Sequence, residues 1–122
     1  MKKFNLLIIL ATAVILVSGV FLVSKAGSPP PLPTAYEYFW KEGCPHCKNV
    51  ESFLEGWEKK GKVQINKIDV GGSSQNARLL SQRADYCKIP AAEVGVPLLF
   101  TPNGKCVGGD EPIINFFKNL NL

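Results

Sequence analysis

The chain has 122 residues, which is enough for one small domain and little else. It carries 14 Lys and Arg against 10 Asp and Glu, and the basic excess is concentrated in residues 1–33, which hold no acidic residue. Because the remainder is nearly neutral, the net charge of +4 is no evidence for a nucleic-acid partner. A hydrophobic fraction of 46% excludes a disordered chain, and four cysteines in so short a chain call for a redox or metal explanation.

Residues 4–23 form a stretch without one charged side chain. As a helix it would span roughly 30 Å, the thickness of a bilayer's hydrocarbon core. Lysines precede the stretch, so we expect residues 1–23 to be a membrane anchor with the N-terminus in the cytoplasm and the rest of the chain outside. A cleaved signal peptide is the alternative and would give a secreted or periplasmic protein, although the apolar region of a signal is normally about 7–15 residues. Residues 24–33 hold four prolines and predict an extended spacer to a domain over residues 34–122.

Strand and helix patterns alternate through the remaining residues. In chain order we expect strand 35–40, helix 45–60, strand 63–70, a helix from Ser73 or Ser74 to about residue 87, strand 96–101, a hairpin turn at 102–104, a short strand 105–107 and a last helix capped by Asp110. The second strand is apolar on both faces, which predicts an internal position. The predicted fold class is α/β, a central mixed four-stranded sheet flanked by helices.

Cys44-Pro45-His46-Cys47 stands where the first strand gives way to a helix. A helix N-terminus favours an anion, and in such CxxC sites the thiol pKa falls from about 8.5 to roughly 3.5–7. We therefore expect Cys44 to attack, Cys47 to resolve the mixed disulfide, and His46 to tune the thiolate by adding positive charge. A stabilised thiolate favours the dithiol, which makes the disulfide the stronger oxidant. The motif leans toward oxidising or isomerising the disulfides of protein substrates.

The other two cysteines leave several interpretations open. A Cys87–Cys106 disulfide would close a loop of about 20 residues and contribute roughly 3 kcal/mol to stability. Free buried thiols, a second redox pair and a metal site are the alternatives. A CxxC carrier of copper or zinc would use all four cysteines, but their spacing lacks the second close pair typical of zinc sites. We predict no metal, and no cofactor other than the Cys44–Cys47 disulfide itself.

The stretch from Tyr38 to Lys48, Val96-Pro97 and the order of elements resemble the thioredoxin superfamily over about residues 34–122. The CPHC sequence is similar to that of DsbA-type oxidases and of the thioredoxin-like domains attached to vitamin K epoxide reductase homologues. The resemblance implies a thiol–disulfide oxidoreductase with Pro97 as a cis-proline facing the CxxC and Val96 pairing with the backbone of a substrate peptide. It also implies cysteine-containing protein substrates and a quinone-linked membrane oxidase as partner, for a chain expected to be a monomer.

The stretch from Gly104 to Asp110 resembles the part of glutaredoxins that holds glutathione. Gly108, Gly109 and Asp110 would then contact the ligand, with a plain glycine turn that caps the helix as the favoured alternative. A glutaredoxin-like or thioredoxin-like reductase is accordingly the alternative function.

One departure from the resemblance bears on the direction of catalysis. Tyr38 stands where thioredoxins carry a buried Asp, and the neighbouring Glu37 should point to the opposite face. Proton transfer from Cys47 would therefore be less assisted, which makes reductase activity the less expected direction.

Overall fold

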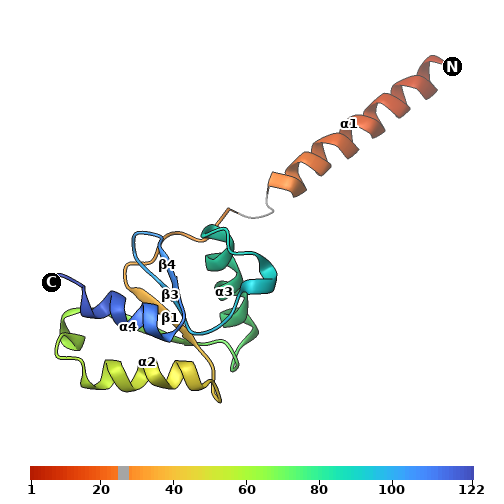
Figure 1. The fold of residues 1–122 in the computed structure, drawn as a ribbon. Coiled ribbons are helices and arrows are strands. Elements are labelled where there is room, and N and C mark those ends of the chain that lie inside the picture. Colours follow the sequence, from red (N-terminus) through yellow and green to blue (C-terminus); the bar gives the residue numbers. More distant parts are fainter. Residues whose placement is uncertain (25–27) are drawn as a thin grey trace.

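The computed structural model describes residues 1–24 and 28–122 and shows an N-terminal helix and a small α/β domain (Figure 1). The elements are, in chain order, α1 (Lys2–Ser24), β1 (Tyr36–Trp40), α2 (Pro45–Gly56), the 3₁₀ turn η1 (Lys60–Lys62), β2 (Ile65–Asp69), α3 (Ser74–Tyr86), the 3₁₀ turn η2 (Ala91–Glu93), β3 (Leu98–Phe100), β4 (Cys106–Gly108) and α4 (Asp110–Lys118). Helix α1 is exposed from Lys2 to Gly19. In the described part of the chain it alone is long and apolar enough to cross a membrane, a property that signal sequences share.

The predicted mixed four-stranded sheet is confirmed, with strand order β2-β1-β3-β4. Strand β1 pairs in parallel with β2 and antiparallel with β3, and β4 pairs antiparallel with β3. The predicted internal position of the second strand is wrong, because β2 lies at an edge of the sheet. Its two-sided apolar pattern has another cause: Ile65 packs with the core on one face and Ile68 with the core on the other.

Helices cover both faces of the sheet. Figure 1 shows α2 and α4 on one face and α3 on the other. Along β1 and β3 the side chains alternate, so that Tyr38 and Leu99 pack with residues of α2 and α4, whereas Phe39 and Phe100 pack with α3. The CxxC motif follows the carboxyl end of β1 and precedes α2.

Two predicted boundaries of this half of the domain differ from the structure. Helix α2 ends at Gly56 instead of residue 60, because Trp57 leaves the helix and packs its ring 5.1 Å from that of Phe117. Helix α4 is preceded by Gly109, with φ +92°, and not by a capping Asp110, which is the first helical residue. Gly109 therefore supplies a backbone conformation that other residues rarely adopt. As expected, Ser73 caps α3, its hydroxyl accepting from the Asn76 N–H.

A buried ion pair fastens the proline-rich segment to the domain. Arg83 of α3 donates from Nε and Nη2 to the two carboxylate oxygens of Glu37 at 2.8 and 3.1 Å. Its Nη1 donates to the backbone oxygens of Pro30 and Pro31 at 3.3 and 3.0 Å, and its guanidinium lies 4.6 Å from the centre of the Phe100 ring. Within the segment that we expected to be an extended spacer, Pro30 and Pro31 are therefore in contact with the domain.

Candidate active site

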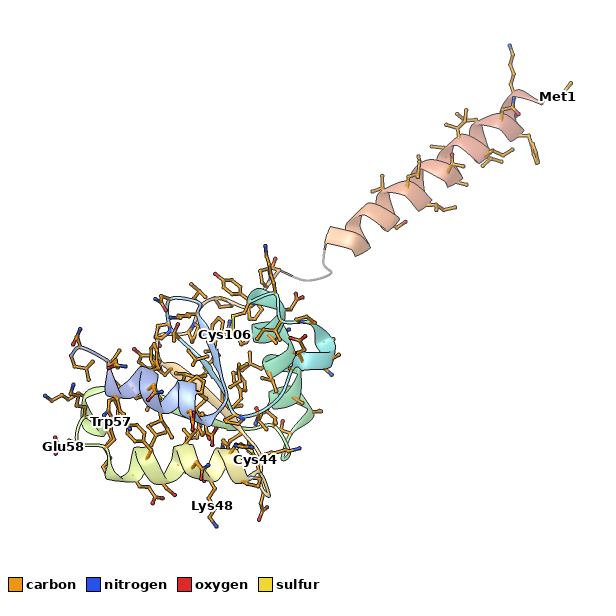
Figure 2. All side chains as sticks on the ribbon, in the orientation of Figure 1. Met1, Cys44, Lys48, Trp57, Glu58 and Cys106 are labelled. Carbon is orange, nitrogen blue, oxygen red and sulfur yellow. A yellow bond between two sulfur atoms is a disulfide. The ribbon has the colours of Figure 1, made fainter. Side chains whose placement is uncertain are left out.

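The two cysteines of the CxxC motif form a disulfide at the N-terminus of α2, with their Cα atoms 5.2 Å apart. Cys44 is the N-cap, with extended backbone angles, and its Sγ accepts a hydrogen bond from the Cys47 N–H at 3.1 Å. Pro45 occupies the first helical position, where its missing N–H costs nothing. Cys44 is half-exposed whereas Cys47 is 1% exposed, so an incoming substrate sulfur meets Cys44 first. Figure 2 labels Cys44 at the start of α2.

The segment before β3 lies against Cys44. The Val96–Pro97 peptide bond is cis, and Cys44 Sγ lies 3.9 Å from the Val96 carbonyl oxygen. The Gly109 N–H donates to the Pro97 carbonyl oxygen at 3.1 Å, which ties the start of α4 to the same segment. Strand β3 begins at Leu98 and not at residue 96, so Val96 and Pro97 form the loop that borders the reactive sulfur.

A polar cluster joins α2 to α4 beside the motif. Asp110 Oδ2 accepts hydrogen bonds from Asn49 Nδ2 at 2.7 Å and from His46 Nδ1 at 3.0 Å. These bonds, that of Asn49 first, lower the pKa of Asp110 to about 2. The His46 side chain is 70% exposed and directs Nδ1 to this carboxylate. A positive charge on His46, which we expected beside Cys44, would therefore have a negative partner in Asp110. The N-terminus of α2 also contributes positive potential at the sulfur.

Tyr38 occupies the position at which the thioredoxin pattern has a buried Asp. Its ring is buried, and its hydroxyl donates to the Cys47 carbonyl oxygen at 3.1 Å. Burial raises the pKa of Tyr38, and the negative charges of Glu51 and Asp110 raise it further. Tyr38 is therefore a neutral hydrogen-bond donor beneath Cys47 and contributes no charge.

An open cleft of about 560 Å³ borders the two sulfurs on the side of β1. It is lined by Trp40, Lys41, Glu42, Gly43, Cys44, Pro45, Cys47, Lys48 and Glu51. We did not single out Glu51 from the sequence. Its position four residues after Cys47, on the same face of a helix, is the signal that could have revealed it.

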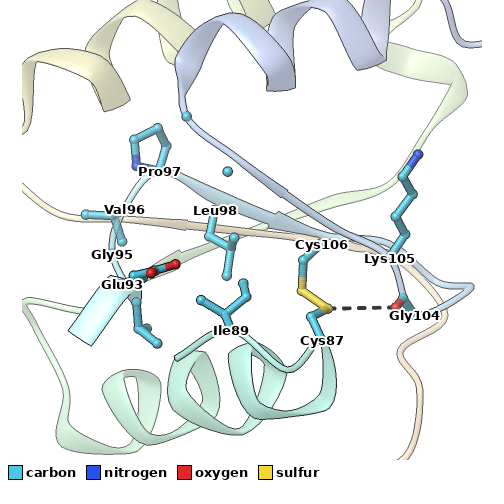
Figure 3. A pocket seen from close by; sticks show the side chains of 13 residues that line it. Cys87, Ile89, Glu93, Gly95, Val96, Pro97, Leu98, Gly104, Lys105 and Cys106 are labelled. Carbon is cyan, nitrogen blue, oxygen red and sulfur yellow. Dashed lines mark hydrogen bonds between the residues drawn. A yellow bond between two sulfur atoms is a disulfide. The ribbon is translucent and has the colours of Figure 1, made fainter. Parts of the chain in front are cut away.

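A second cleft, of about 630 Å³, runs from Val96 and Pro97 to a second disulfide, between Cys87 and Cys106 (Figure 3). The Cα atoms of this pair are 6.2 Å apart. Cys87 caps the C-terminus of α3, and its Sγ lies 3.9 Å from the Gly104 carbonyl oxygen. Helix C-termini and carbonyl oxygens disfavour a thiolate, so this disulfide has the opposite electrostatic setting to that of Cys44–Cys47.

The residues compared with a glutathione site are partly engaged within the protein. Gly108 lies in β4 opposite Leu98, the Gly109 N–H is bonded to Pro97, and Asp110 holds His46 and Asn49. In the described residues no group of three or more His, Cys, Asp or Glu side chains is arranged to hold a metal ion.

Comparisons with a family model and with solved structures both point to the glutaredoxins. The family model described as Glutaredoxin matches residues 36–107. The chain is similar to the structure of a mutated buckwheat glutaredoxin, with a TM-score of 0.52, 15% identity and 72% of each chain covered. It is also similar to a wheat glutaredoxin, with a TM-score of 0.50 and 24% identity over 71% of this chain and 73% of that one. No curated protein matches the chain. The two structures show a shared thioredoxin-like fold.

Proposed function

Because the chain belongs to the glutaredoxin family, we propose that it is a thiol–disulfide oxidoreductase that exchanges disulfides with protein cysteines through Cys44 and Cys47. One observation carries the proposal. Cys44 is half-exposed at the first turn of α2, and its Sγ accepts a hydrogen bond from the Cys47 N–H at 3.1 Å and borders the Val96–Pro97 segment. An N–H donor and a helix N-terminus at one sulfur stabilise a thiolate there, and the thiolate is the reactive form.

The exchange follows from the different exposure of the two sulfurs. With the pair oxidised, a substrate thiolate attacks Cys44 Sγ, the Cys44–Cys47 bond breaks, and Cys47 leaves as a thiolate. A second substrate thiolate then attacks the substrate sulfur of the mixed disulfide, which releases Cys44 as a thiolate and leaves the substrate oxidised by two electrons. With the pair reduced, each step runs in reverse. We assign the substrate-facing backbone to Val96 and Pro97, since they flank the attacked sulfur.

We propose oxidation of substrate thiols or isomerisation of substrate disulfides as the direction of catalysis. Stabilising the Cys44 thiolate stabilises the dithiol state and makes the disulfide the better oxidant. The His46–Asp110 pair weakens this effect, because the carboxylate offsets the imidazole charge. The family match supports glutathione-coupled reduction as the second candidate, with Gly108, Gly109 and Asp110 at the ligand.

We further propose that the domain works outside the cytoplasm, held to a membrane by α1. The apolar and exposed α1 supports this location, as does the Cys87–Cys106 disulfide, since disulfides persist outside the cytoplasm. A quinone-linked membrane oxidase is the class of partner that would reoxidise Cys44 and Cys47.

The test uses the full chain in detergent micelles. We expect alkylation of Cys44 to follow a pKa below about 7, and the redox potential to lie nearer to about −120 mV than to about −270 mV. A Cys47→Ala variant should trap mixed disulfides with substrate proteins, and a Cys44→Ser variant should trap none. Full thiol-oxidising or insulin-reducing activity in Cys44→Ser would overturn the proposal. A potential near about −270 mV would select the reductase candidate.

A further inference from the structure

We infer that Glu51 accepts the proton of the Cys47 thiol when Cys47 resolves a mixed disulfide at Cys44, an inference that rests on the proposed function. Cys47 must lose a proton to attack, because only the thiolate is nucleophilic. At 1% exposure, Cys47 has little access to bases in solution. A nearby protein group is therefore needed to take the proton.

Glu51 is placed to be that group. It stands one helical turn after Cys47 on α2, and both residues line the 560 Å³ cleft beside the disulfide. Its side chain is half-buried, and none of the hydrogen bonds or ion pairs formed among residues 28–122 involves its carboxylate. Its charge acts on the Tyr38 hydroxyl, which is itself bonded to the Cys47 backbone.

The other charged groups around Cys47 are less suited to the task. The Tyr38 hydroxyl is a donor already engaged with a carbonyl oxygen, and Asp110 holds two hydrogen bonds on α4. Lys41 and Lys48 line the cleft but are cations, and Glu42 is fully on the surface. Glu51 thus remains as the half-buried carboxylate in this cleft.

Trp40 supplies an independent observation in the same cleft. Its indole Nε1 is buried and has no hydrogen-bond partner within the described chain, although most buried N–H groups are satisfied by protein or water. The Trp40 side chain thus adds an unpaired donor to the cleft that Cys47 and Glu51 line.

The Glu51 carboxylate takes the proton from Cys47, the Cys47 thiolate attacks Cys44 Sγ, and the bond between Cys44 and the substrate sulfur breaks. The cysteine pair is oxidised by two electrons, and the substrate disulfide is reduced by two. The substrate leaves as a thiolate and takes a proton from Glu51 or from solvent.

The test separates the two chemical steps with an aromatic disulfide whose thiolate absorbs visible light. After selective reduction of Cys44–Cys47 in the full chain, attack by Cys44 releases the first thiolate and resolution by Cys47 releases the second. In Glu51→Gln we expect an unchanged first phase and a second phase slowed at least about tenfold at pH 7. The difference should shrink as the pH rises toward and above the pKa of the Cys47 thiol, because the thiol then ionises without help. Glu55→Gln, one turn further along α2 and exposed, is the matched control and should leave both phases unchanged.

Other outcomes of this experiment would overturn the role of Glu51 as proton acceptor. A purely electrostatic Glu51 would hinder ionisation of Cys47, so its removal would speed the second phase. A faster or unchanged second phase, or one slowed equally at every pH, overturns the inference. A slow first phase in the unmodified chain would instead refute the proposed function.

Discussion

Replacing Glu37 by Ala removes the carboxylate that pairs with Arg83 and leaves a guanidinium with only 5% of its side chain exposed. The two direct bonds, at 2.8 and 3.1 Å, form a bidentate pair in the interior. Removing one partner of a buried pair costs about 3–5 kcal/mol, because the other charge stays buried. Small domains are stable by about 5–15 kcal/mol, so a large part of the stability is lost. The midpoint of thermal unfolding should fall by at least about 12 °C.

The assay is urea and thermal unfolding of the full chain in detergent, followed by tryptophan fluorescence. Glu42→Ala, at an exposed site near the same strand, is the control and should change stability by less than about 0.5 kcal/mol. The double variant Glu37→Met/Arg83→Met should lose less than Glu37→Ala, because neither charge remains buried. A loss below about 1 kcal/mol in Glu37→Ala, typical of exposed pairs, would refute the reasoning.

Two further predictions concern stability around the site. The pKa of Asp110 is lowered from 3.8 to about 2, so its contribution is present above about pH 4 and is lost as pH falls through 2. The urea midpoint of the unmodified chain should therefore fall more steeply between pH 4 and pH 2 than that of Asp110→Asn, and parallel curves would contradict the assignment. Replacing Cys87 and Cys106 by Ser should lower the free energy of unfolding by roughly 3 kcal/mol, because the disulfide closes a loop with a sequence separation of 19. Redox exchange at Cys44 and Cys47 should be retained. Loss of exchange in a folded variant would instead give the Cys87–Cys106 disulfide a redox role.

Local patterns were sufficient to predict the fold and the place of the motif. The order of elements, the mixed sheet and the helix that begins after Cys44 follow from periodicity, and the structure confirms them. The edge position of β2 did not follow, because apolar residues on both faces are equally expected of an internal strand and of an edge strand covered by helices on both sides. The strand order depends on pairings across the chain, which a local pattern does not encode.

Contacts between distant residues explain the rest. Glu37 was expected to turn away from Tyr38, and it does, but its partner Arg83 is 46 residues away and has no signal in the sequence around it. The bond between His46 and Asp110 likewise joins residues 64 apart. Both contacts change the electrostatics of the domain, so residue types near the motif were not enough to predict the charge at the site.

The hydrogen bonds from Arg83 to the backbone of Pro30 and Pro31 fix where the chain enters the domain. That entry lies before the amino end of β1, while Cys44 follows its carboxyl end, with a strand of about 16 Å between them. Five residues, 25–29, separate Ser24 from Pro30, so this connecting segment can span at most about 20 Å. If α1 lies in a bilayer, so short a connection keeps the domain close to the lipid surface, within reach of the proposed membrane oxidase.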